Sequence, residues 1–265
     1  MNRTIGATRA VRLTGGLFAV ALAAAALVGC GSELNPLAEP TAKEKLLATV
    51  PDGAEGPFRF THKDSTGELT GSVDGAAKAA ELAISTKDPE HGFTTKVAFL
   101  VIGDDVWSKI TFSDTEGLTG LPKLPKTWMA IDRAKLDDGE SVPRYEGVDI
   151  GNTGPLIQAA TSVEDQGSGK YSGSIDLTSG EAAEVLEADQ MTALGEAAKQ
   201  VPFTATVDGD GNLTSLTLEV PAAGDAKAYT YVVTYEDYGN APKLTAPEGD
   251  EAQPAPAAAY EMFNA

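Results

Sequence analysis

From Phe58 onward, hydrophobic residues recur with a period of two in a series of short segments, which is the pattern of strands with one buried face. The middle of the chain, over 113–170, is less regular. Leu216, Leu218 and Val220 alternate with polar residues, so one side of this strand is expected to be covered and the other to meet solvent. Short turns rich in Asp, Ser and Gly favour antiparallel hairpins between neighbouring strands. Strands are predicted over 58–62, 69–73, 82–84, 93–102, 106–112, 170–177, 203–207, 213–220 and 228–235.

One predicted strand has no polar face. Residues 97–102 read Val-Ala-Phe-Leu-Val-Ile, so both sides of this strand are expected to be covered. Helices or a cavity could provide the cover. The loop over 118–125 is also unusually apolar, because it carries Leu118, Leu121 and Leu124.

Helix signals are fewer than strand signals. Thr41 and Glu44 have the spacing of a capping box, which predicts a helix to about residue 49. Asn152 begins a second helix signal with Pro155 in its first turn, running to about residue 160. A further capping box over 178–181 predicts helix to about residue 188, followed by another helix over 192–199. The balance predicts an α+β domain dominated by antiparallel strands.

The first thirty residues have the pattern of an export signal. Arg3, Arg9 and Arg12 form a basic start, and the uncharged stretch over 13–29 is rich in Ala, Leu and Val. That stretch is at the lower edge of the ~20 residues that a membrane span needs. We therefore assign 1–29 to a signal peptide, and 30–40 to a tether that begins at Cys30, the only cysteine of the chain.

Composition excludes several classes of function. The formal net charge is −19, and it becomes −22 once the signal peptide with its three arginines and no acidic residue is removed. Such acidity argues against nucleic acid as a partner, because phosphate recognition calls for a surplus of Lys and Arg. A single cysteine excludes an internal disulfide framework and a multi-thiolate metal site. The expected product is an exported, acidic protein on the outer face of the cell membrane.

Few residues are candidates for chemistry. Asp208, Asp210, Asn212 and Glu219 match four positions of a calcium loop, but Leu213 stands where the loop needs glycine. A plain hairpin turn is the favoured interpretation. No carboxylate pair lies among clustered aromatic residues, and the nucleophile elbow of serine hydrolases is missing. We therefore predict no catalytic residue, no metal ligand and no cofactor, with a hydrolase as the least supported alternative.

The two histidines of the chain are assigned structural roles. His62 lies in a strand pattern, and His91 lies in a turn bounded by Pro and Gly.

The segment Leu27-Val28-Gly29-Cys30 resembles the lipobox of bacterial lipoproteins. The resemblance implies that a diacylglycerol is attached to the Cys30 thiol and that the chain is cut after Gly29. Two acyl chains suffice for stable anchoring, whereas one chain binds marginally. The membrane is therefore an expected partner through lipidated Cys30.

Beyond the lipobox, the chain resembles the actinobacterial LppX/LprA/LprF/LprG lipoproteins. The segments that carry the resemblance are GDDVWSKITF at 103–112, KTWMAID at 126–132, FTATVDGDGNLTSLTLEV at 203–220 and YTYVVTYEDYGNAPKLTAP at 229–247. The resemblance implies a fold similar to LolA and LolB, a curved antiparallel sheet or half-barrel with helices packed on its concave face. It also implies a non-enzymatic protein whose hydrophobic cavity carries or presents an acylated lipid or glycolipid in the cell envelope.

The candidate domain therefore spans 41–247, and the Pro- and Ala-rich tail over 248–265 is predicted to be disordered. Residues expected to line the cavity, or the core beneath it, are Phe99, Val101, Ile110, Phe112, Leu216, Leu218, Tyr231 and Val233. The alternative is an acidic cell-surface interaction or sensory module with a filled core and no lipid cargo. No particular envelope protein is indicated as a partner.

Overall fold

The computed structural model describes residues 39–186 and 188–264. The predicted signal peptide, the lipobox with Cys30 and most of the predicted tether lie outside the described residues. Contacts divide the chain into two units, Met1–Glu39 and a compact unit over Pro40–Ala265. Among the described residues, no helix is both long enough and apolar enough to cross a membrane.

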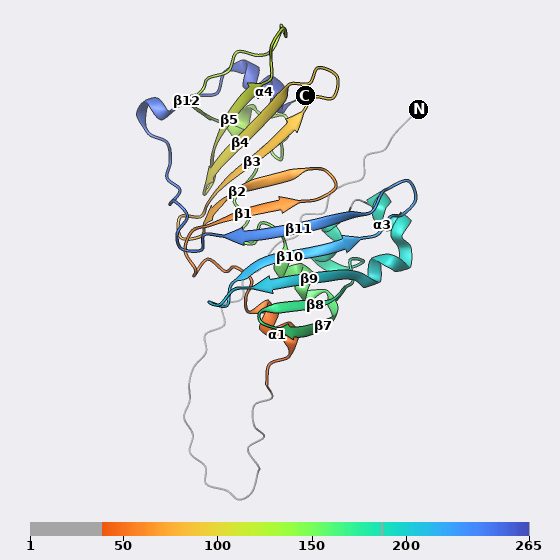
Figure 1. Ribbon diagram of the computed structural model, residues 1–265. Coiled ribbons are helices and arrows are strands. Elements are labelled where there is room, and N and C mark those ends of the chain that lie inside the picture. Colours follow the sequence, from red (N-terminus) through yellow and green to blue (C-terminus); the bar gives the residue numbers. More distant parts are fainter. Residues whose placement is uncertain (1–38, 187, 265) are drawn as a thin grey trace, which may run out of the picture. The chain divides into compact units, whose positions relative to one another are not determined.

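A twelve-stranded sheet dominates the compact unit (Figure 1). The strands are β1 (Phe58–Lys63), β2 (Glu68–Asp74), β3 (Ala79–Lys87), β4 (Thr94–Ile102), β5 (Asp105–Ser113), β6 (Trp128–Ala130), β7 (Ala160–Gly167), β8 (Lys170–Ile175), β9 (Val201–Val207), β10 (Leu213–Val220), β11 (Tyr229–Glu236) and β12 (Ala252–Pro254). Their order is β12-β6-β5-β4-β3-β2-β1-β11-β10-β9-β8-β7. All neighbouring pairs are antiparallel except β12 with β6. The predicted α+β class with a large antiparallel sheet is confirmed.

Short helices lie between and after the strands. The α-helices are α1 (Ala42–Leu47), α2 (Thr153–Gln158), α3 (Ala188–Leu194) and α4 (Ala257–Phe263), and the 3₁₀ helices are η1 (Arg133–Lys135), η2 (Gly180–Val185), η3 (Gly195–Gln200) and η4 (Gly249–Glu251). α1 has the predicted capping box between Thr41 and Glu44. The box predicted over 178–181 is wrong, because Ser179 is the N-cap of η2 and makes no side-chain capping hydrogen bond.

The register aligns mostly apolar residues on one face of the sheet from β5 to β8. One cross-strand row runs through paired residues from β5 to β8: Ile110, Val97, Ile84, Leu69, His62, Val233, Leu216, Ala205 and Tyr171. We call this set the apolar row. Since strand side chains alternate between faces, every member points to the same side of the sheet.

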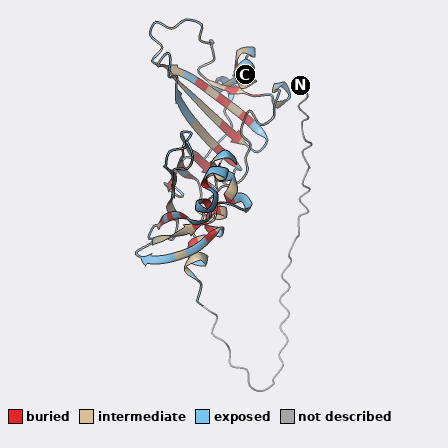
Figure 2. Ribbon diagram, turned by 90° about the vertical axis from the view of Figure 1, so that its right-hand side faces the viewer, coloured by how far each residue is buried: buried red, intermediate tan, exposed pale blue. Residues whose placement is uncertain are grey.

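Two separate hydrophobic cores cover this face. Figure 2 shows buried residues on both the upper and the lower strands of the sheet. The first core packs α1, α2, η2, α3 and η3 against β1, β2 and β8 to β11, with Leu156 and Leu216 among its fully buried residues. The second core packs β4, β5 and β6 against the 131–145 segment and α4. Leu100 and Val101 are both buried, and as neighbours they point to opposite faces, so the predicted cover on both sides of this strand is confirmed there.

The tail predicted to be disordered is ordered. β12 pairs with β6, and α4 buries Ala259 completely against the second core. Phe263 lies 5.8 Å from Phe99 between ring centroids. The disorder prediction was based on the average composition of the tail. The apolar side chains that pack against the second core are concentrated in its last few residues, so the average does not reveal them.

The helix predicted from Asn152 to about residue 160 is confirmed as α2, which ends at Gln158. Strand β7, which begins at Ala160, is not predicted by the sequence. The strand alternates only weakly in its burial, with most side chains exposed, because it is the last strand of the sheet.

Candidate functional site

The apolar row is buried on either side of an open middle stretch. Ile110 belongs to the second core, and Val233 and Leu216 belong to the first. Between them Ile84 has 46% of its surface exposed, the one large hydrophobic residue of the described chain that is this exposed. Leu69 and Val97, on either side of Ile84, are half-buried. The apolar face therefore has an uncovered middle on β1 to β4.

Three adjoining hollows follow this uncovered stretch, and we call them together the central groove. The first, of about 80 Å³, lies along His62, Leu69 and Ile84. The second, of about 210 Å³, shares His62 and Asp64 with the first. The third, of about 360 Å³, lies beside Leu82 and shares Ile150 and Asn152 with the second. Their sizes lie within or below the range of ~300–1,000 Å³ that is usual for small-molecule sites.

Asp149 holds the loop that forms one wall of the groove. Its carboxylate accepts hydrogen bonds from the backbone nitrogens of Thr153 at 2.9 Å and Gly154 at 2.7 Å, which are the first residues of α2. The Tyr235 hydroxyl donates to the same carboxylate at 2.9 Å. Tyr231 donates to the carbonyl of Gly151 at 3.0 Å. The 149–152 loop is therefore tied to β11 as well as to its own helix.

The middle hollow has a polar lining. The ring of His62 packs against that of Tyr231 with 4.6 Å between centroids. Nε2 of His62 is shielded from solvent and has no hydrogen-bond partner; it lies 3.8 Å from the Asp64 carboxylate. Tyr229 donates a weak hydrogen bond to Gln190 across this hollow at 3.4 Å. Strand β11, helix α3 and the β1–β2 turn thus meet here.

Burial and hydrogen bonding set the charges in the middle hollow. Burial lowers the pKa of His62, and the nearby Asp64 carboxylate opposes this only in part. For Asp64, burial alone raises the pKa, but hydrogen bonds from Thr66 and Gly67 outweigh it, so the pKa is lowered. Near neutral pH the imidazole is therefore uncharged beside an ionised carboxylate.

The predicted lining residues are divided between the two cores. Val101, Ile110, Leu216, Leu218 and Val233 are buried. Phe99 and Phe112 are half-buried against the second core. Tyr231 is the predicted residue that lines the groove. The structure thus places the other residues in the packed layers at either side of the groove.

Most of the residues that line the groove are not predicted from the sequence. They are Leu69, Leu82, Ile84, Ile150 and Asn152. Leu82 and Ile84 did carry a signal, since they alternate along a predicted strand, but alternation does not tell which apolar residues remain uncovered. The contribution of the 149–152 loop has no local signal, because it depends on contacts with β11.

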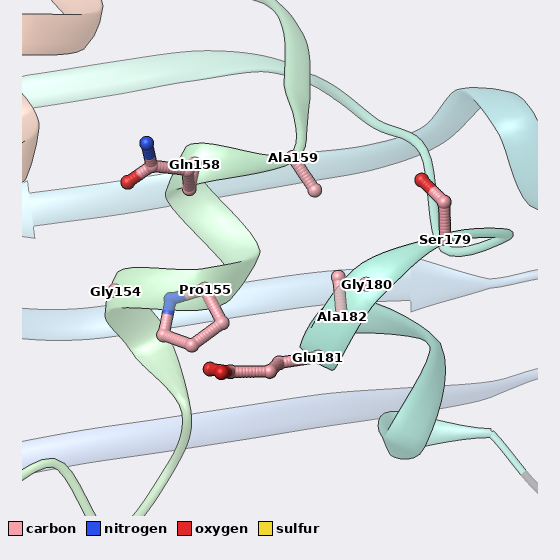
Figure 3. Close-up of a pocket in the computed structure, with 8 residues that line it drawn as sticks. All are labelled: Gly154, Pro155, Gln158, Ala159, Ser179, Gly180, Glu181 and Ala182. Carbon is pink, nitrogen blue, oxygen red and sulfur yellow. The ribbon is translucent and has the colours of Figure 1, made fainter. Parts of the chain in front are cut away.

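A larger hollow of about 670 Å³ lies between α2 and η2 (Figure 3). Its lining consists mainly of small residues such as Gly154, Ala159 and Gly180, with the strands passing behind the two helices in this view. Gln158 and Glu181 are its larger polar side chains. The hollow is wide open to solvent and lacks the convergent polar groups of a binding site.

The Asp208–Asn212 segment forms the predicted turn between β9 and β10. The Asp208 carboxylate accepts backbone hydrogen bonds from Asp210 and Asn212, both at 2.9 Å. Within residues 39–186 and 188–264, no group of three or more His, Cys, Asp or Glu residues is arranged to hold a metal ion. His91 lies in the β3–β4 turn, 3.1 Å from Asp88.

Comparisons with known proteins do not assign this chain to a family. The sequence matches no family model and no curated protein. Among solved structures, a porin-like protein from Bacteroides uniformis is similar at 11% sequence identity and a TM-score of 0.23, over 71% of this chain and 99% of that chain. A TM-score this low does not indicate a shared fold or function, so the function is inferred from the site alone.

Proposed function

We propose that this protein is a membrane-anchored, non-enzymatic lipoprotein that binds an acylated lipid or glycolipid along the central groove and carries or presents it in the cell envelope. The observation that carries the proposal is the interruption of the apolar row, where Val97, Ile84 and Leu69 lie between two packed cores without full cover. An acyl chain is the kind of ligand that gains from such a surface, at about 0.8 kcal/mol for each buried CH₂ group.

The sheet is proposed to curve in the manner of LolA and LolB, with the groove on its concave face. This finer description is supported by the helices, which pack on the same face as the apolar row in the first core. The anchor is proposed to be lipidated Cys30, on the strength of the lipobox motif alone.

A second candidate is an acidic interaction or sensory module without lipid cargo. It is favoured by the packing of Leu216, Leu218 and Val233, all of which are fully buried. In that case Ile84 and its neighbours would contact a protein partner rather than an acyl chain.

Native mass spectrometry of the full chain, released from detergent micelles, tests the first proposal. Purification from a host that makes the lipids is expected to yield an additional mass corresponding to one lipid. Ile84→Asp places a charge in the groove where the acyl chain is proposed to lie. Uptake of added diacyl lipid is therefore expected to be weakened at least about tenfold, which corresponds to ~1.4 kcal/mol of binding free energy.

Ser85→Asp is the matched control. Ser85 is exposed, neighbours Ile84 on β3 and points to the opposite face. The Ser85→Asp substitution introduces the same charge as Ile84→Asp but lies outside the groove. Lipid uptake is therefore expected to be unchanged. A protein that carries no lipid and takes up none would contradict lipid carriage and leave the interaction module.

A further inference from the structure

The middle hollow of the central groove differs in chemistry from the stretch along Leu69, Leu82 and Ile84. Its lining brings together two tyrosines, two carboxamides and two carboxylates around His62. Tyr229 and Tyr231 come from β11, Asn152 from the loop before α2, and Gln190 from α3. Apolar and polar chemistry therefore adjoin along one groove, as an amphipathic ligand requires.

The charges of this hollow exclude an anionic group. Asp64 and Glu184 line it, and none of its described lining residues is Lys or Arg. The depressed pKa of His62 leaves the imidazole without charge at neutral pH. A phosphate placed here would meet two carboxylates and no compensating cation, which is unfavourable in a partly dehydrated site.

Unused hydrogen-bonding capacity indicates what could bind instead. The imidazole of His62 lines the hollow, and its Nε2 atom has no hydrogen-bond partner. The Asp64 Oδ1 atom accepts three hydrogen bonds, from Thr66 N and Oγ1, both at 2.7 Å, and from Gly67 N at 3.1 Å. Its Oδ2 atom is the one near His62, at 3.8 Å.

We infer that the middle hollow binds the uncharged, hydroxyl-bearing head group of the acylated ligand whose chains lie along Leu69, Leu82 and Ile84. A hydroxyl group both donates and accepts, so it can pair with the uncharged imidazole of His62 and with the carboxylate of Asp64, which both line the hollow. Tyrosine rings and carboxamides supply an apolar platform and further hydrogen bonds for such a group. This inference rests on the proposed function and specifies the head group.

Three synthetic lipids with identical acyl chains test the inference on the full chain. They carry one neutral hexose, a phosphatidylglycerol head group and a quaternary ammonium head group, and their binding is compared by native mass spectrometry. The hexose lipid is expected to bind at least about tenfold more tightly than the phosphatidylglycerol, a difference of ~1.4 kcal/mol. This comparison needs no variant, so it does not depend on the folding of a mutant.

His62→Phe and Asp64→Asn then locate the effect. His62→Phe keeps a ring against Tyr231 but removes the nitrogen, and is expected to weaken hexose-lipid binding severalfold while leaving phosphatidylglycerol binding unchanged. Asp64→Asn is expected to reduce the preference for the hexose lipid. His91→Phe is the matched control, because His91 is exposed in the β3–β4 turn and does not line the groove.

The outcomes separate the two proposals. If none of the three lipids binds, the proposed function fails. If all bind equally and His62→Phe changes nothing, lipid binding stands and the head-group inference is overturned. Tighter binding of the phosphatidylglycerol or of the ammonium lipid also overturns it. The head-group inference is supported if the protein prefers the hexose lipid, if His62→Phe removes this preference and if His91→Phe retains it.

Discussion

Leu82 and Phe99 face each other directly across the β3–β4 pair, yet they pack into different hydrophobic cores. Leu82 contacts the core beneath the first helices, whereas Phe99 contacts the core that contains α4. Tyr145 is half-buried against both cores. The boundary between the cores therefore follows β3 and β4, and the central groove lies beside it.

The packing of Leu216 leads to a prediction about stability. Leu216 is fully buried on β10, so Leu216→Ala is expected to lower the free energy of unfolding by about 2–5 kcal/mol. Leu69→Ala is expected to lower the free energy of unfolding clearly less, because Leu69 borders the groove and is half-buried. Urea unfolding of the two variants measures both changes. Equal losses would show that Leu69 is packed as a core residue and that the groove is closed there.

Gly71 is expected to tolerate no side chain. A Cβ atom there would collide with the carbonyl oxygen of Glu81 on β3 and come within 2.9 Å of the Phe60 ring. Gly71→Ala is therefore expected to destabilise the protein by more than the ~1 kcal/mol of a typical substitution, because backbone must move. Gly209→Ala is the control, since a Cβ atom at Gly209 meets nothing within 4 Å. Thermal unfolding with no difference between the two variants would contradict the close approach.

The C-terminal helix is expected to contribute to stability. Phe263→Ala removes the ring that packs against Phe99 and is expected to cost about 1–3 kcal/mol, less than for a fully buried Phe. Glu261 is exposed on the same helix, so Glu261→Ala is expected to change stability by at most ~0.5 kcal/mol. Hydrogen exchange of β5 and β6 is expected to accelerate in Phe263→Ala. Unchanged exchange and stability would show that α4 is not part of the core.

The hydroxyl of Tyr235 is expected to matter through Asp149. Tyr235→Phe keeps the edge-on contact with Phe58 but removes the donor to the Asp149 carboxylate. The free energy of unfolding is expected to fall by about 1–3 kcal/mol, because the variant loses a hydrogen bond to a charged acceptor in a largely buried site. Tyr171→Phe on β8 is the control, expected within ~0.5 kcal/mol. Equal effects in urea unfolding would argue against the role of Asp149.

His62 is expected to make stability depend on pH below neutrality. Burial lowers its pKa in the folded protein, so the unfolded chain binds the proton more readily. This contribution is present above the unfolded pKa of about 6.5 and is lost as the pH falls through that value. In His62→Phe, the decline in melting temperature between about pH 6.5 and 5 is expected to be smaller than in the unchanged protein. An identical decline in both proteins would rule out His62 as its source.

Local patterns were sufficient to predict most of the sheet. Alternation over 213–220 predicted β10, the Thr41 and Glu44 pair predicted the cap of α1, and Asp208–Asn212 predicted a hairpin turn. These signals succeed because side-chain alternation, capping and turn formation depend on residues a few positions apart. The prediction failed for the tail, because its order depends on β6 and the second core, which are remote in sequence. Strand β7 was not predicted, because its mostly exposed side chains lack the alternation of a half-buried strand, although its partner β8 follows directly in the chain.

The sequence alone determined that most of the strands have one apolar side. Only the tertiary structure decided where that side is covered, because cover depends on contacts between distant segments. Phe263 covers Phe99 from the far end of the chain, and Asp149 holds the groove loop against Tyr235. No such contact reaches Ile84, so it stays exposed on a strand whose pattern resembles that of its buried neighbours.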